Sequence, residues 1–334
     1  MNNLLPSHLV QAMRRLRMLP PVIAAVLLAS CGGGDEAARY RSVGMTGEAI
    51  DYQFDATVLS YEYTVTDSAS GLAGKTAKGV LASNADGTFT PSGVDNSRVA
   101  ALANGIMLGA VRERFGDADA TMPFIGLKDT TTTTAALAAQ YNYVHRSCST
   151  ATACDASYGT LRIEADGAWR RCREGNLVAG ACTGAVDSGT LEALGNGKWR
   201  VKSGDGSDIG MAIGYGDAGQ KLFVLQLKDA RRAGFGNGML VGGEQALMTA
   251  EIADGTYIAG MNTGVWFQFT GKGSEVNITH LNFEPVDLKV TVTPNAPWAG
   301  MTTTAWGEIG FISAAGLYLL KTPGGDLELG VKLR

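Results

Sequence analysis

Tight-turn dipeptides recur along this chain, and they constrain its fold more than any other feature. Each places glycine after Asp, Asn or Gly, and most of them separate stretches in which apolar and polar residues alternate. Hairpin turns of type I′ need a positive φ at both central residues, which Asn-Gly and Asp-Gly adopt at low cost. The sequence therefore predicts turns of this kind at Asp86-Gly87, Asp166-Gly167, Asn196-Gly197, Asp254-Gly255 and Gly324-Gly325.

Period-two alternation marks the expected strands. It is clearest at 59–65, 288–292 and 327–333, and this pattern is typical of strands with one buried face. The denser apolar runs 221–227 and 265–269 indicate more deeply buried strands, and we expect 221–227 to be central in its sheet.

The chain also repeats itself at two scales. A short unit, in which glycine is followed seven positions later by Asp-Gly or Asn-Gly and then by an aromatic residue, occurs at 79–89, 159–169 and 189–199. A longer match relates 115–129 to 215–229, and we interpret it as duplicated β modules with boundaries near 138 and 251. Chance similarity between glycine-rich β sequences is the alternative.

Together these patterns predict an all-β fold with minor helix, built from two or three tandem small antiparallel β-barrel or β-sandwich modules. Helix is expected only at 95–104, 135–140 and 245–250, and the threonine run 130–134 is expected to be a linker. The modules would span 43–138, 139–250 and 251–334, and the last would be a third module or would complete the second.

Composition narrows the class of protein. The 334 residues include 45 glycines, about twice the ordinary share of roughly 7%, which fits short strands and tight turns. The formal net charge is −4, and no basic cluster occurs beyond the N-terminal region. This argues against nucleic acid and anionic membrane surfaces as partners.

The first thirty residues have the pattern of an export signal. Three arginines precede the apolar run 18–29, which ends in small residues. The run is about half as long as the roughly 20 residues that a membrane-spanning helix needs. Met1 and Met13 are both open as the start of the chain.

The end of this signal, Leu28-Ala29-Ser30-Cys31, resembles the lipobox of bacterial lipoproteins. The resemblance implies removal of residues 1–30 and lipidation of Cys31, with 31–42 as a flexible tether; an unmodified thiol in a longer signal is the alternative. Gly32 stands where Asp would favour retention in the inner membrane. The resemblance therefore implies an outer-membrane protein, lipid-anchored and facing either the periplasm or the surface. The body resembles β-rich, glycine-rich lipoproteins of Gram-negative bacteria, which implies no activity.

Four further cysteines are expected to form two disulfides, because an even number in an exported chain indicates oxidised pairs. We favour Cys148–Cys154 and Cys172–Cys182 among the three connectivities. A zinc site is the alternative, but its ligand pairs usually lie two to four residues apart, which these pairs do not.

Motifs for catalysis or cofactors are weak. The stretch 214–219 satisfies G-x-G-x-x-G, but a strand-like run follows where dinucleotide binding needs a helix, so we expect a turn and no nicotinamide cofactor. His145 and His280 are the only histidines after the signal, and we expect neither to be a catalytic base or metal ligand. No catalytic residue, metal or cofactor is predicted. Carboxylates that could pair, or that could bind Ca²⁺ at 205–208, look like turn residues: Asp117, Asp119, Glu164, Asp166, Asp205 and Asp208.

Tryptophans are the remaining candidates for a binding surface. Trp169 and Trp199 occupy the repeated position after a turn and are expected to pack. Trp298 follows a proline-rich loop, and it and Trp306 are the better candidates for presentation to a partner.

The sequence thus predicts a membrane-anchored lipoprotein that is a non-catalytic binding or envelope-interaction module. Its partners would be the membrane, through the lipid anchor, and an envelope protein, a glycan or a lipophilic ligand. A hydrolase using a carboxylate pair and a structural accessory subunit of an envelope assembly are the alternatives. An apolar cavity inside a barrel would favour the lipophilic ligand, and facing carboxylates of perturbed pKa would favour the enzyme.

Overall fold

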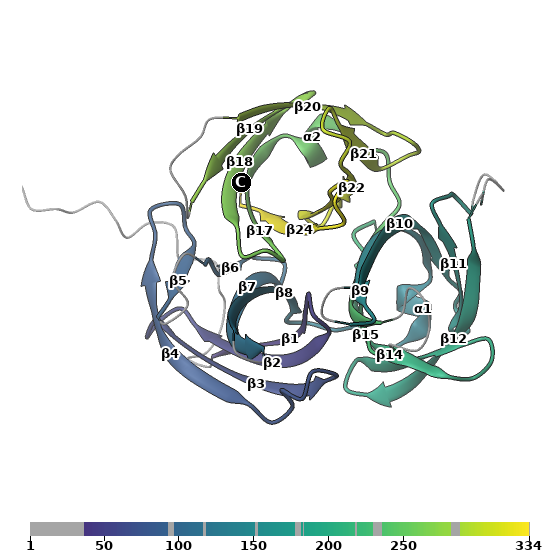
Figure 1. The fold of residues 1–334 in the computed structure, drawn as a ribbon, viewed down its shortest axis with the longest axis horizontal. Helices are drawn as coiled ribbons and strands as arrows, with labels where there is room; N and C mark the ends of the chain where they lie inside the picture. Colours follow the sequence, from purple (N-terminus) through teal and green to yellow (C-terminus); the bar gives the residue numbers. More distant parts are fainter. Residues whose placement is uncertain are drawn as a thin grey trace, which may run out of the picture. The chain divides into compact units, whose positions relative to one another are not determined.

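The computed structural model describes residues 37–92, 97–115, 118–150, 153–177, 182, 184–217, 219–229, 236–281 and 288–333. These residues form three eight-stranded antiparallel sheets that follow one another along the chain (Figure 1). We name them barrels 1, 2 and 3. The predicted all-β fold of tandem antiparallel barrels with little helix is confirmed.

Barrel 1 has the strand order β5-β4-β3-β2-β1-β8-β7-β6. Phe89 of β5 and Val99, just before β6, close the ring by exchanging backbone hydrogen bonds of 2.8 and 2.7 Å. Its strands are β1 (Ala38–Gly44), β2 (Glu48–Asp55), β3 (Ser60–Ser68), β4 (Thr76–Ser83), β5 (Phe89–Pro91), β6 (Ala100–Ala101), β7 (Ile106–Phe115) and β8 (Ala118–Leu127). Residues 38–42, which the sequence assigned to the tether, thus belong to β1.

Barrels 2 and 3 are closed rings in which consecutive strands pair and the last strand returns to the first. Barrel 2 contains β9 (Ala139–Cys148), β10 (Cys154–Ile163), β11 (Ala168–Arg173), β12 (Val186–Gly195), β13 (Lys198–Ser203), β14 (Asp208–Tyr215), β15 (Leu222–Leu227) and β16 (Asn237–Glu244). Barrel 3 contains β17 (Gly255–Met261), β18 (Trp266–Lys272), β19 (Glu275–His280), β20 (Leu288–Pro294), β21 (Met301–Thr304), β22 (Ile309–Ile312), β23 (Leu317–Lys321) and β24 (Leu327–Lys332).

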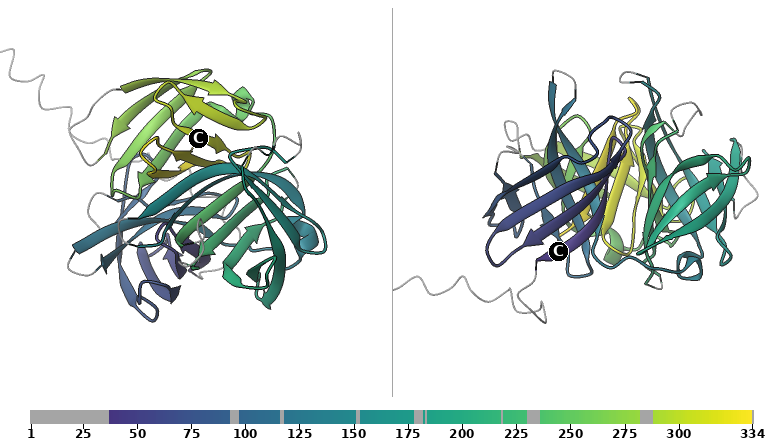
Figure 2. Two further views of the ribbon diagram at one scale, coloured as in Figure 1. Left: turned by 45° about the vertical axis from the view of Figure 1, so that its right-hand side comes forward. Right: turned by 90° about the horizontal axis from the view of Figure 1, so that it is seen from below.

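Short hairpin loops join neighbouring strands (Figure 2). Many of these loops have five residues. In 84–88, the N–H of Asn84 donates to the carbonyl of Thr88 at 2.9 Å, and the N–H of Gly87 donates to the carbonyl of Asn84 at 3.2 Å. Glycine in the fourth position has a positive φ, so a type I turn can be followed by a left-handed residue that matches the strand twist. The same pattern occurs at 102–106, 164–168, 203–207, 261–265, 304–308, 313–317 and 322–326.

The turn type expected from the sequence is therefore right at one site and wrong at others. Asn196-Gly197 has φ values of 52° and 67°, as type I′ requires. At Asp86-Gly87 and Asp166-Gly167 only the glycine has a positive φ, because the Asp carboxylate instead accepts the N–H two residues on. Gly324-Gly325 belongs to a five-residue loop, and Asp254-Gly255 connects a helix to β17.

Two one-turn helices precede barrels 2 and 3. They are α1 (Thr134–Leu137) and α2 (Ala250–Ala253), each capped by a threonine hydroxyl, and Figure 1 shows each inside the ring of its barrel. The helix predictions at 135–140 and 245–250 were thus each displaced by a few residues. The helix expected at 95–104 is wrong where the chain is described, since Ala100–Ala101 is strand β6.

One apolar core is shared by all three barrels. It contains Val43 of barrel 1, Val224 and Val241 of barrel 2, and Leu319 and Val331 of barrel 3. Strand β15, expected to be central, is buried at every position because its alternate residues face this shared core and the lumen of barrel 2. The outer face of a barrel strand is therefore apolar wherever another barrel covers it.

Candidate functional site

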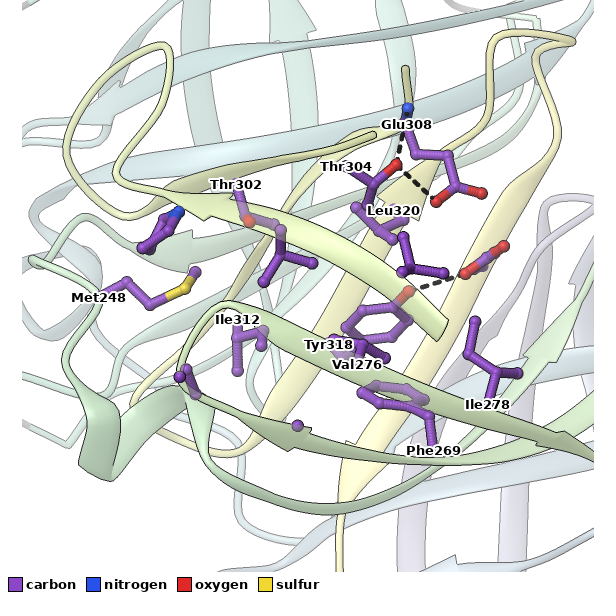
Figure 3. A pocket seen from close by; sticks show the side chains of 17 residues that line it. Met248, Phe269, Val276, Ile278, Thr302, Thr304, Glu308, Ile312, Tyr318 and Leu320 are labelled. Carbon is purple, nitrogen blue, oxygen red and sulfur yellow. Dashed lines mark hydrogen bonds between the residues drawn. The ribbon is translucent and has the colours of Figure 1, made fainter. Parts of the chain in front are cut away.

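The lumen of barrel 3 contains the cavity that we take as the candidate site (Figure 3). It is narrow: the centre of a water molecule can occupy about 50 Å³ of it, and its total empty space is about 650 Å³ when the part open to solvent is included. Apolar side chains from most strands of the barrel form its wall: Met248, Phe269, Val276, Ile278, Val290, Val292, Ile312 and Leu320. Ligand sites are commonly concave and mainly apolar.

The lumen of barrel 2 is filled more completely than that of barrel 3. Trp169, Trp199 and Phe223 point into barrel 2, and Leu137 of α1 is fully buried among them. In barrel 3, α2 has no buried side chain, and the inward positions of β19 are the smaller Val276 and Ile278. Both remain partly accessible, although they face the inside of a closed barrel. The corresponding empty space in barrel 2 is about 270 Å³.

The segment that carries α2 is fixed at one end of this lumen. The Tyr257 hydroxyl donates to the carbonyl of Ile252 at 2.8 Å, and the Asp254 carboxylate accepts the N–H of Gly273 at 2.7 Å. Just before the helix, Asn295 bonds to the backbone N–H and carbonyl of Met248. These bonds fix residues 248–254, which we call the plug, at the end of the barrel. No side chain of α2 itself is buried in the lumen.

Glu328 of β24 is the most unusual group in the cavity. It is 8% exposed, and the Tyr318 hydroxyl donates to its Oε2 at 2.8 Å. Burial, with a smaller contribution from the charge of Glu308, raises the pKa of Glu328 to about 8. The carboxyl of Glu328 is therefore largely protonated near neutral pH.

Glu308 lines the same cavity from the 304–308 hairpin. Its backbone N–H and its carboxylate both bond to the Thr304 hydroxyl, at 3.2 and 2.9 Å (Figure 3). Burial raises the pKa of Glu308 as well, and the hydrogen bond from Thr304 opposes that shift. The cavity thus combines apolar walls with two carboxyl groups, and the charge of Glu308 helps to raise the pKa of Glu328.

Sequence reasoning missed Glu308, Glu328 and Tyr318 as a site. In 327–333 the alternation suggests that Leu327 and Leu329 face a lumen and that Glu328 faces solvent. The structure has the opposite arrangement, because the leucines join the core shared between barrels and Glu328 points into barrel 3. The signal available in the sequence was a glutamate, Glu328, flanked by two leucines. That β24 is buried on both faces is seen only in the structure.

The four predicted disulfide cysteines are joined as Cys148–Cys154 and Cys172–Cys182. The first pair connects directly opposed residues of β9 and β10, next to the loop between these strands. Cys31 and the rest of the lipobox lie outside the described residues, so the lipidation site stays a prediction. Among the described residues, no group of three or more His, Cys, Asp or Glu side chains is arranged to hold a metal ion.

The two candidate surface tryptophans lie in different environments. Trp298 is partly buried, stacks on Tyr158 at 5.9 Å between ring centroids, and donates from Nε1 to Asn142 at 2.9 Å. It therefore links the 295–300 loop of barrel 3 to barrel 2. Trp306 is 45% exposed in the 304–308 hairpin, two residues before Glu308.

Neither His145 nor His280 is among the residues that line the cavity. His145 is fully buried inside barrel 2, with the Ser157 hydroxyl 2.7 Å from Nδ1 and Asp155 3.9 Å from Nε2. Burial lowers the pKa of His145 well below its ordinary value, and the charges of Arg171 and Arg173 lower it further. The imidazole is therefore neutral. His280 lies at the end of β19.

Among the paired carboxylates proposed from the sequence, Asp166 and Asp205 are turn residues, whereas Asp208 is the first residue of strand β14. Asp166 accepts the N–H of Ala168, and Asp205 accepts the N–H and hydroxyl of Ser207. Asp117 lies outside the described residues, as does the side chain of Asp119. The 214–219 stretch connects antiparallel β14 and β15, and Gln220 donates to the carbonyl of Asp217 within it, as a turn requires.

No protein-family model matches the chain, and it has no significant match among curated proteins or solved structures. None of the helices in the described residues is long and apolar enough to cross a membrane.

The buried carboxyl of Glu328 should make stability depend on pH. Its pKa is raised in the folded state, so the folded protein holds a proton that the unfolded chain releases between about pH 4.5 and 8. The stabilisation is fully present below that range and is lost as pH rises through it, at up to about 1.4 kcal/mol per pH unit. Glu328→Gln removes this loss, so its free energy of unfolding, measured with urea at pH 5, 7 and 8.5, should fall less with pH than that of the wild type.

The exposed Glu275 on β19 provides the matched control. Glu275→Gln should keep the wild-type pH dependence. Equal slopes for the wild type and Glu328→Gln would contradict the assignment of a protonated carboxyl at this position.

Proposed function

We propose that this protein is a membrane-anchored binding module whose third barrel carries a lipophilic ligand. The observation that supports the ligand is the hollow apolar lumen of barrel 3, next to a barrel of the same strand number that is filled. An unfilled apolar lumen leaves Val276, Ile278 and Ile312 without part of the packing that a core supplies. A bound apolar chain restores those contacts.

The narrow shape of the lumen favours a flexible chain over a rigid ring system. Its walls are β-branched and aliphatic side chains around Phe269 and Tyr318, so selection along most of the ligand is by shape and dispersion. Burying a methylene group contributes about 0.8 kcal/mol, so a chain of several methylenes gains useful affinity from the walls alone.

Anchoring is the second part of the proposal and is supported by the sequence. The lipobox-like Leu28-Ala29-Ser30-Cys31 follows an export-like segment, and acyl chains on Cys31 would hold the protein in the outer membrane. The tether would keep the binding barrel close to a membrane, where lipophilic molecules are concentrated.

A hydrolase is the second candidate, because Glu308 and Glu328 line one cavity and the charge of Glu308 helps to raise the pKa of Glu328. Glycoside cleavage uses two carboxyl groups, one protonated and one ionised, on either side of the bond that breaks. Hydrolysis of a chromogenic glycoside that Glu308→Gln and Glu328→Gln both abolish would establish this function. The apolar walls offer few partners for sugar hydroxyls, so we place binding first.

Filling the lumen should abolish ligand binding. Ile278→Trp adds bulk inside the barrel, whereas Thr279→Trp adds the same bulk on the exposed face of β19. We expect Ile278→Trp to weaken the binding of decanol at least tenfold by calorimetry and Thr279→Trp to leave it unchanged, with circular dichroism confirming that both fold. Equal affinities of Ile278→Trp and Thr279→Trp for decanol would contradict the proposal.

Removing the lipidated thiol should release the protein from membranes. Cys31→Ser, expressed with its own signal in a Gram-negative host, should move from the membrane fraction to the soluble periplasmic fraction. The wild type should stay with the membrane after a high-salt wash. An unchanged distribution of Cys31→Ser would refute the anchor and leave the ligand proposal untouched.

A further inference from the structure

The polar side chains that line the barrel 3 lumen carry hydroxyl and carboxyl groups. These groups come from Thr302, Thr304, Tyr318, Glu308 and Glu328, and the other described residues that line the lumen bring no charged side chain. The described lining of the cavity therefore contains two acids and no basic side chain.

Glu328 accepts fewer hydrogen bonds than it would need as an ionised, buried carboxylate. An ionised carboxyl group accepts several hydrogen bonds, and Glu328 receives one, from Tyr318. Among the ion pairs of the described residues, none includes Glu308 or Glu328. Buried acids without a cation are costly, and proteins tolerate them mainly where they serve a function.

We infer that barrel 3 selects an amphiphile whose single polar group is a cation, as in a long-chain primary amine. Its ammonium group would lie beside Glu308 and Glu328, and its chain would extend among Val276, Ile278 and Val292 towards Met248. This inference rests on the proposed function and specifies the class of ligand.

An ammonium group supplies the hydrogen-bond donors and the positive charge that the site lacks. Its three N–H groups can donate to both carboxylates, and its charge offsets the repulsion between them. A neutral alcohol offers one donor and no charge. A fatty acid would add a third carboxyl group to a low-dielectric space, which like charges disfavour.

Binding of the cation should also release a proton. The groups that act on the ionisation of Glu328 by charge or hydrogen bond are Glu308, Tyr318 and Asp326, and none of them is cationic. An ammonium group beside Glu328 favours its ionised form, so the proton that Glu328 holds near neutral pH goes to the buffer. The number of protons released is measurable by calorimetry in buffers of different ionisation enthalpy.

The test uses the full chain with Cys31→Ser, purified without detergent, and three ligands with the same ten-carbon chain. Decylamine should bind at pH 7 at least tenfold more tightly than decanol, and decanoate should bind most weakly. Decylamine should release between half a proton and one proton. In Glu328→Gln the preference for decylamine over decanol should shrink to less than threefold and proton release should disappear, whereas Glu275→Gln should match the wild type.

Each outcome is decisive. Equal binding of decylamine and decanol, or tighter binding of decanoate, overturns this inference and leaves the lipophilic lumen of the proposed function standing. Failure of all three ligands to bind overturns both. A preference for decylamine that persists in Glu328→Gln would remove Glu328 from the recognition of the cation and refute the site as assigned here.

Discussion

The apolar core shared by the three barrels is the constraint on which the rest of the structure depends. A strand of an isolated barrel has one face towards the lumen and one towards water. Here Leu222 and Val224 of β15, and Leu329 and Val331 of β24, are buried on the outside, because neighbouring barrels cover them. The outer faces of these strands then supply much of the apolar burial, and the lumens can differ without loss of the common fold.

Barrels 2 and 3 differ in the side chains that fill their lumens. Trp169, Trp199 and Leu137 of α1 fill barrel 2, so its lumen is part of the core. In barrel 3 helix α2 contributes no buried side chain, β19 points Val276 and Ile278 inwards, and a glutamate occupies the wall. Two barrels with the same strand number and connection pattern thus differ in how completely their interiors are filled.

Local patterns in the sequence predicted the architecture well, because turn chemistry and alternation are properties of neighbouring residues. Asn196-Gly197, the strand at 221–227 and the two disulfide pairs are examples. The candidate site was not predictable in the same way. Which side of β24 faces a lumen depends on a barrel far away in the sequence, so Glu328 looked like a solvent-exposed residue although it is buried. The Asp-Gly turns were misassigned because the Asp side chain competes for the backbone N–H.

The contrast between the two lumens is the central claim, and xenon binding followed by methyl NMR tests it most directly. Xenon enters dry apolar cavities and shifts the signals of the methyl groups around it. We predict saturable shifts at Val276, Ile278, Val292 and Ile312 in barrel 3, and none at Leu161, Val201, Ile209 and Leu225 in barrel 2. Equal responses in both barrels, or no response in barrel 3, would contradict the account.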